Sequence, residues 1–163
     1  MQWRPFVYNR KTYDLSHLHR RALIYAPPVK DGKTPLRYKT EITFSMHCFT
    51  RGLKPGECPE PKLLYSDERE TRVFDFHRYE LSHNLPALID QLPDHKCFHT
   101  GAGNFFTVKL LDTHGEAVEY EVFFKAYKAA KKGSITLFIE SAYVRDREHS
   151  IQRGPMQRRS PSR

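Results

Sequence analysis

Three successive segments in the C-terminal half alternate apolar and polar residues, and this pattern constrains the fold more than any other feature of the chain. The segments cover residues 104–112, 118–127 and 134–144. Alternation with a period of two is typical of β-strands, in which successive side chains point to opposite faces. Short turn sequences separate the segments, at Asp112 to Glu116 and at Lys131 to Ser134. The pattern therefore predicts an antiparallel three-stranded meander.

The N-terminal half adds one strand and one helix. Residues 40–49 also alternate, which predicts a strand with Cys48 on its apolar face and His47 on its polar face. Asp14 or Ser16 is expected to cap a short helix near the N-terminus. A further set of apolar residues has the spacing of one helical face, which predicts a helix over at least 85–92. These residues are Leu81, Leu85, Leu88, Ile89 and Leu92. The predicted fold class is α+β, with a central antiparallel β-sheet and one or two packed helices.

The length of 163 residues indicates a single α+β domain, which we assign to residues 1–146. Residues 147–163 contain almost no large apolar side chains, so we expect a disordered basic tail. No apolar run approaches the roughly 20 residues that a membrane-spanning helix needs. The N-terminus lacks the apolar core of a secretory signal. The sequence therefore predicts a cytoplasmic protein with reduced cysteines and no membrane partner.

The charge balance points to a polyanionic partner. Lys and Arg number 27 against 19 Asp and Glu, which gives a formal net charge of +8 and a pI near 9.5. Half of this excess lies in the predicted tail. A basic protein of this kind is suited to binding phosphates. We therefore expect nucleic acid as the partner, and a partner protein remains open.

Four stretches of the chain resemble a known bacterial family. They are residues 45–50, 67–75, 103–108 and 141–146. The resemblance covers residues 40–146 and is to accessory-genome proteins labelled stationary-phase growth adaptation proteins. It implies a bacterial protein and names no chemistry.

A more distant resemblance concerns topology. A helix followed by a three-stranded meander, whose last strand ends in Tyr143-Val144-Arg145, resembles the fold of barnase, EndoU and RelE-type ribonucleases. This resemblance implies a nucleic-acid-binding module with a toxin-like, metal-independent ribonuclease activity, and so favours RNA over DNA as the partner. Such an enzyme activates a ribose 2′-hydroxyl with a base, donates a proton to the leaving oxygen and stabilises the phosphorane with cations.

The sequence supplies candidates for each of these tasks without a metal or cofactor. The catalytic candidates are His47, His99, Tyr143 and Arg145. The candidate nucleic-acid-binding residues are Arg72, Arg78, Lys109, Lys125 and Tyr127. Each has a simpler interpretation, because histidines often make structural hydrogen bonds and outward strand lysines often face only solvent.

Two other classes of function stay open. A non-enzymatic interaction factor of a bacterial mobile element predicts an exposed apolar patch formed by Phe105, Phe123 and Phe138. A zinc-binding protein would use a cysteine and histidine set whose spacing lacks the usual C-x₂-C knuckle. That set is Cys48, Cys58, Cys97, His47 and His99.

Overall fold

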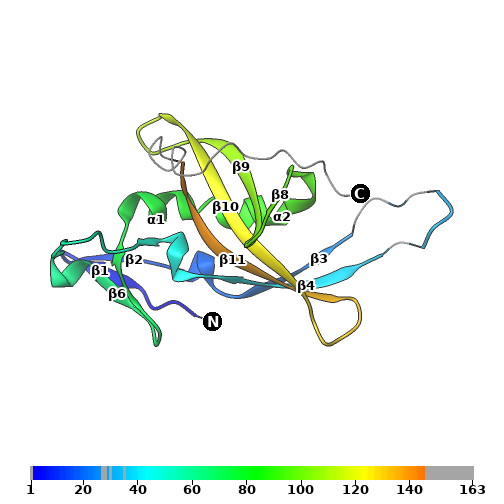
Figure 1. The fold of residues 1–163 in the computed structure, drawn as a ribbon, viewed down its shortest axis with the longest axis horizontal. Helices are drawn as coiled ribbons and strands as arrows, with labels where there is room; N and C mark the ends of the chain where they lie inside the picture. Colours follow the sequence, from blue (N-terminus) through cyan, green and yellow to red (C-terminus); the bar gives the residue numbers. More distant parts are fainter. Residues whose placement is uncertain (1, 27–28, 30, 35, 146–163) are drawn as a thin grey trace.

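The computed structural model of the chain describes residues 2–26, 29, 31–34 and 36–145, and the predicted tail over 147–163 lies outside the described residues. Its fold is α+β, as the sequence predicts, and a six-stranded sheet dominates it (Figure 1). The strand order in this sheet is β3-β4-β11-β10-β9-β8. The strands are β3 (Arg21–Tyr25), β4 (Tyr38–Phe44), β8 (Phe98–Thr100), β9 (Gly103–Leu111), β10 (Ala117–Lys128) and β11 (Ser134–Val144).

The predicted meander is confirmed, since β9, β10 and β11 pair in antiparallel register. The strand β4 joins the meander in the parallel direction, with Lys39 opposite Ser134 and Phe44 opposite Ile139. The edge strands β3 and β8 pair antiparallel with β4 and β9. The sheet is therefore antiparallel except at the pairing of β4 with β11.

The strand predicted over 40–49 ends early, at Phe44. The Ser45 side chain accepts a hydrogen bond from the backbone N–H of His47 and so caps the 3₁₀ helix η2 (Met46–Cys48). Met46 and Cys48 remain buried within this turn. The prediction of a continuous strand was wrong here because a capped 3₁₀ turn can also bury alternate residues. His47 therefore lies on a helical turn and not on a strand face.

A smaller sheet and several short elements cover one end of the large sheet. The smaller sheet has the order β5-β7-β6, with β5 (Thr50–Arg51), β6 (Leu64–Ser66) and β7 (Thr71–Phe74). A hairpin pairs β1 (Phe6–Tyr8) with β2 (Lys11–Tyr13). The remaining short elements are the 3₁₀ helices η1 (Ser16–Leu18), η3 (Pro61–Leu63) and η4 (Leu92–Asp94). The expected N-terminal helix is the single turn η1, at which Asp14 Oδ1 accepts from the backbone N–H of Ser16.

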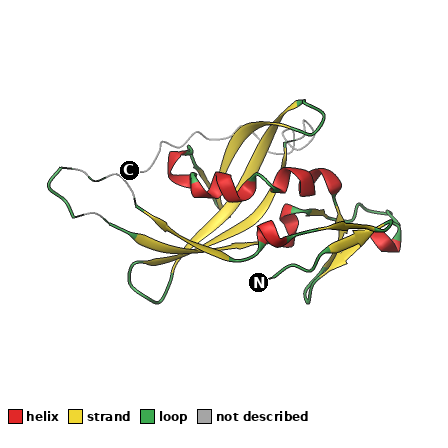
Figure 2. Ribbon diagram, turned by 180° about the vertical axis from the view of Figure 1, so that it is seen from behind, coloured by secondary structure: helices red, strands yellow, loops and turns green. Residues whose placement is uncertain are grey.

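The helices α1 (Phe76–Ser82) and α2 (Leu85–Asp90) lie over one face of the six-stranded sheet (Figure 2). The helix predicted over 85–92 begins where expected, with Pro86 in its first turn, and ends two residues earlier. Burial of apolar area against the sheet is the main stabilising contribution of such short helices. The buried contacts come from three helical residues and three sheet residues. They are Leu81, Leu85, Ile89, Phe106, Val122 and Ile139.

The other face of the sheet, here called the second face, carries a row of stacked rings across four strands. Phe98, Phe105, Phe123 and Tyr143 follow one another at centroid distances of 5.3, 5.4 and 5.4 Å. Phe105 is only 4% exposed, and Phe123 and Phe138 are half-buried. These three phenylalanines therefore do not form the exposed apolar patch expected for an interaction factor, because Phe105 is buried and Phe123 and Phe138 are each partly buried.

Candidate functional site

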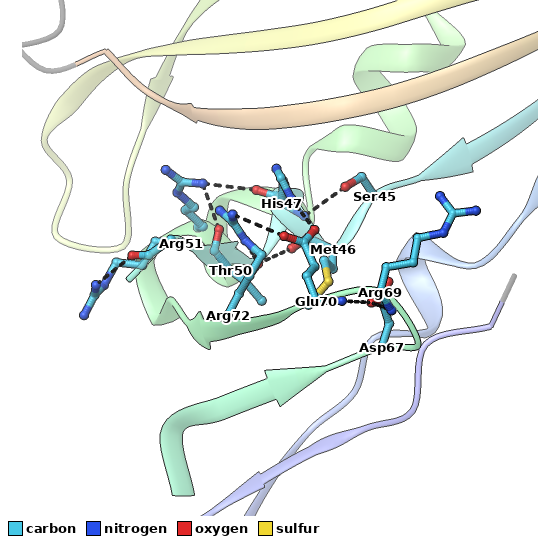
Figure 3. A network of polar contacts seen from close by, with 11 residues as sticks. Ser45, Met46, His47, Thr50, Arg51, Asp67, Arg69, Glu70 and Arg72 are labelled. Atoms are coloured by element: carbon cyan, nitrogen blue, oxygen red, sulfur yellow. Dashed lines mark hydrogen bonds and ion pairs between the residues drawn. The ribbon is translucent and has the colours of Figure 1, made fainter. Parts of the chain in front are cut away.

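The turn that follows β4 presents the first candidate residue, His47. Its Nε2 lies 2.6 Å from Oε1 of Glu70, which precedes β7 (Figure 3). The His47 side chain is 33% exposed, so solvent and small ligands reach it. A carboxylate at hydrogen-bond distance from one ring nitrogen fixes the orientation of the imidazole.

Arg72, on β7, lies beside this pair. Its Nε donates a hydrogen bond to Oγ1 of Thr50 at 2.9 Å, and its Nη1 lies 3.8 Å from Oε2 of Glu70. The Arg72 side chain is only 14% exposed. Burial lowers the pKa of this guanidinium, Glu70 opposes that change, and the nearby Arg78 reinforces it. Two like charges are thus held close together.

Arg78, on α1, completes the arrangement. Its Nη1 donates to the carbonyl oxygens of His47 at 3.2 Å and Thr50 at 2.8 Å. Its guanidinium also lies 5.1 Å from the centroid of the Tyr143 ring. We call His47, Thr50, Glu70, Arg72 and Arg78 the His47 cluster. The structure therefore brings together four predicted site residues, His47, Arg72, Arg78 and Tyr143.

Arg145 lies just beyond the end of β11, two residues from Tyr143. Its backbone N–H donates to the carbonyl of Glu119, and its Nε lies 3.8 Å from Oε1 of Glu121. Glu121 is fully buried. The Arg145 charge therefore compensates an internal carboxylate, which competes with its predicted role at a phosphate.

His99 is not part of the cluster. It lies on the edge strand β8, and its Nδ1 bonds Oδ1 of Asn104 on β9. The strand β8 is the outer edge of the sheet, three strand positions from β11, whereas His47 lies on η2 after β4 on the other side of β11. No hydrogen bond or ion pair joins His99 to the cluster residues within the described part of the chain. The glycine loop after His99 is a tight turn in which Thr100 pairs with Gly103.

The remaining predicted residues lie on the second face of the sheet. Lys109 is exposed on β9, opposite Glu119. Lys125 Nζ lies 3.6 Å from Oε1 of Glu140. Tyr127 is 53% exposed near the end of β10. Lys125 and Tyr127 are neighbours, whereas Lys109 lies further along the sheet toward the β9–β10 turn.

The structure also brings together a group of cations that the sequence did not predict to lie near one another. The backbone N–H of Lys39 donates to the carbonyl of Gly133 at 3.1 Å, so the start of β4 meets the β10–β11 turn. The two loops leave the same end of the sheet (Figure 1). Five exposed cations gather there, and we call them the basic end: Arg37, Lys39, Lys128, Lys131 and Lys132. Within the described residues, none of the five has a carboxylate at ion-pair distance.

The zinc alternative receives no support from the described residues, where no three side chains of His, Cys, Asp or Glu gather as metal ligands. Cys48 is buried, and burial raises the pKa of its thiol to about 12, which disfavours the thiolate that zinc binds. No helix in the described part of the chain is long and apolar enough to cross a membrane.

Comparison with known proteins assigns the chain to a bacterial family. Residues 5–162 match the YjaZ family, so the chain belongs to that family. It is similar to Protein YjaZ from Escherichia coli (strain K12), with 33% identity over 145 residues that cover 87% of this chain and 79% of the relative. No solved structure matches the chain. The comparisons confirm that the chain belongs to a bacterial family, but they support neither the growth-adaptation label nor the ribonuclease likeness.

Proposed function

We propose that the protein binds RNA, and that the basic end provides the contacts to the phosphates. The observation that carries this proposal is the gathering of exposed cations on β4, β10 and the adjoining loops, none of which has a carboxylate at ion-pair distance within the described residues. Elsewhere in the described part of the chain several arginines are paired, as Arg20 is with Glu41, Arg21 with Asp90 and Arg51 with Glu57. An RNA-binding role also fits the predicted cytoplasmic location.

Charge complementarity explains why this end suits a polyanion. Each lysine that contacts a phosphate releases a condensed counterion, so affinity falls as salt concentration rises. For a single strand the logarithmic slope changes by about 0.7 for each phosphate contact. Lysines on flexible stems at loop tips bind phosphate as point charges, without demanding one fixed geometry.

The test is a salt-dependent titration by fluorescence anisotropy, with a labelled single-stranded RNA of roughly 12 nucleotides. The variant Lys131→Ala/Lys132→Ala is expected to weaken binding and to reduce the salt slope by about 1.4. The matched control Lys54→Ala/Lys62→Ala removes the same charge from exposed sites outside the basic end and should leave the slope unchanged. Equal losses in the two double variants would contradict the proposal.

A second candidate function is metal-independent RNA cleavage at the His47 cluster, favoured by the His47–Glu70 contact beside two guanidinium groups. In this reaction the His47 imidazole takes the proton of a ribose 2′-hydroxyl, whose oxygen attacks the adjacent phosphorus. The bond from phosphorus to the 5′-oxygen breaks, and the leaving oxygen takes up a proton from solvent or the imidazolium. Arg72 and Arg78 would stabilise the phosphorane charge, and Glu70 is a positioning residue.

Cleavage is tested by incubating the full chain with total RNA in EDTA. His47→Ala should abolish cleavage, and Glu70→Gln should lower kcat with little change in KM, because it removes the carboxylate that orients the imidazole. His99→Ala is the matched control, since His99 lies outside the cluster and should retain full activity. An activity that survives His47→Ala or disappears in EDTA would refute this candidate and leave RNA binding unaffected.

A further inference from the structure

One cross-strand row links an exposed aromatic ring to a polar hollow on the second face. Tyr127 on β10 is opposite Thr136 on β11, Thr136 is opposite Glu41 on β4, and Glu41 is opposite Ala22 on β3. Partners in register share a face of the sheet. Two strand spacings separate Tyr127 from Glu41, which is about 10 Å.

Tyr127 differs from the other aromatic residues of this face. The rings from Phe98 to Tyr143 stack on one another, so they cover each other's flat faces. The Tyr127 ring belongs to no such pair in the described part of the chain, and more than half of its surface is exposed. Lys125 lies two residues before Tyr127 on β10 and shares its face of the sheet. An exposed ring beside a lysine is an arrangement on which the bases of single strands stack.

The hollow lies at the other end of the same row. It is a shallow depression, open to solvent, with a volume of about 370 Å³, and Ala22 and Glu41 belong to its lining. Gln2, His19, Arg20 and Arg21 complete the lining.

The hollow presents both donors and acceptors. The Arg20 guanidinium hydrogen-bonds the Glu41 carboxylate, and this bond holds the pKa of Glu41 below its usual value. Arginine donors and a carboxylate acceptor are the groups that read the polar edges of bases.

The basic end adjoins both features. Lys39 lies two residues before Glu41 on β4 and therefore on the same face, opposite Ser134 and close to the β10–β11 turn. A sugar-phosphate backbone that contacts Lys39 and Lys131 runs along the end of the sheet, next to the row that carries the ring and the hollow. Phosphate, ring and hollow are thus within the reach of a few consecutive nucleotides.

We propose that the RNA bound at the basic end is single-stranded, with one base stacked on Tyr127 and a neighbouring base inserted in the hollow at Arg20 and Glu41. This inference rests on the proposed RNA binding. The bases of a duplex are stacked inside it, and the deep major groove of A-form RNA hides their edges, whereas a single strand can turn its bases outward. The ring and the hollow therefore select single strands, while the lysines attract any polyanion.

The experiment compares a single-stranded RNA of roughly 12 nucleotides with its duplex form by anisotropy at one salt concentration. Tyr127→Ala is expected to weaken single-strand binding by roughly 5-fold to 100-fold, with an unchanged salt slope and no effect on the duplex. Tyr127→Phe keeps the ring and should bind like the wild type. Leu111→Ala is the matched control, because Leu111 is 71% exposed at the far end of β9.

A second measurement addresses the hollow. Glu41→Gln is expected to change the order of affinity among the four homopolymeric single strands, whereas Glu116→Gln, exposed in the β9–β10 turn, should not. Equal affinities for single strand and duplex, together with a Tyr127→Ala variant that binds the single strand as tightly as the wild type, would overturn this inference and leave the proposed RNA binding intact. Failure of the wild type to bind any RNA would overturn both proposals.

Discussion

The stacked imidazoles of His17 and His83 predict an acid sensitivity that experiment can isolate. The two rings lie 3.9 Å apart and are nearly parallel, and His17 Nε2 is 2.7 Å from Oγ of Ser82 on α1. Burial, reinforced by His83, lowers the pKa of His17 from 6.5 to about 4. This contact joins η1 to α1.

The direction of the pH dependence of stability follows from the linkage between proton binding and folding. The unfolded chain takes up a proton at His17 below about pH 6.5, whereas the folded chain resists it until about pH 4. The contribution of the neutral His17 ring to the free energy of unfolding is therefore fully present above about pH 6.5, and it is lost as the pH falls from 6.5 toward 4. The whole pKa difference corresponds to about 3 kcal/mol, and because the ring is half-buried, solvent screening reduces this to about 1–2 kcal/mol.

The assay is urea denaturation of the wild type and His17→Asn at several pH values between about 7.5 and 4.5. The variant also loses the hydrogen bond to Ser82, and this loss lowers its free energy of unfolding by the same amount at every pH. Other titrating groups are common to both proteins, so the difference in unfolding free energy isolates His17. We expect this difference to shrink by about 1–2 kcal/mol as the pH falls. Parallel curves for the two proteins would refute the reasoning.

Three further predictions concern other parts of the chain. Arg10 has a φ of +64° in the β1–β2 turn, so Arg10→Gly should stabilise the protein by about 0.5–1 kcal/mol in urea titrations. Asp75 accepts a hydrogen bond from the backbone N–H of Arg78, so Asp75→Ala should cost about 1 kcal/mol by the same measurement. In the native protein at about pH 8, Cys58 is exposed and should react rapidly with a thiol reagent, whereas burial raises the pKa of Cys48 to about 12 and should protect it until unfolding. Rapid modification of Cys48 in the folded chain would contradict that view of its environment.

The meander was predictable because its information is local. Each of β9, β10 and β11 alternates within itself, and each connecting turn carries a recognisable signal, such as Gly115 or Gly133. Local signals also placed the start of α2. The end of β4 was not predictable from alternation, since the cap at Ser45 produces the same burial pattern with a different backbone.

The candidate site was harder to predict because its residues meet through contacts between distant segments. His47 and Glu70 meet only when the smaller sheet folds back beside η2. Lys39 reaches Lys131 and Lys132 only through the pairing of β4 with β11. A single sequence gives no direct signal for either contact. The types of residue in the site could therefore be predicted, but not which of them lie close together.

The pairing of β4 with β11 also bears on how the chain is made. The partners in this ladder are separated by more than half the chain, so β4 emerges from the ribosome long before β11 exists. At about 5–20 residues per second, the ribosome leaves the inner edge of β4 without its neighbour for seconds. During that interval the apolar side chains of β4 are available to chaperones or to the same strand of another nascent chain. Synthesis rate and chaperone supply would then govern the yield of folded protein.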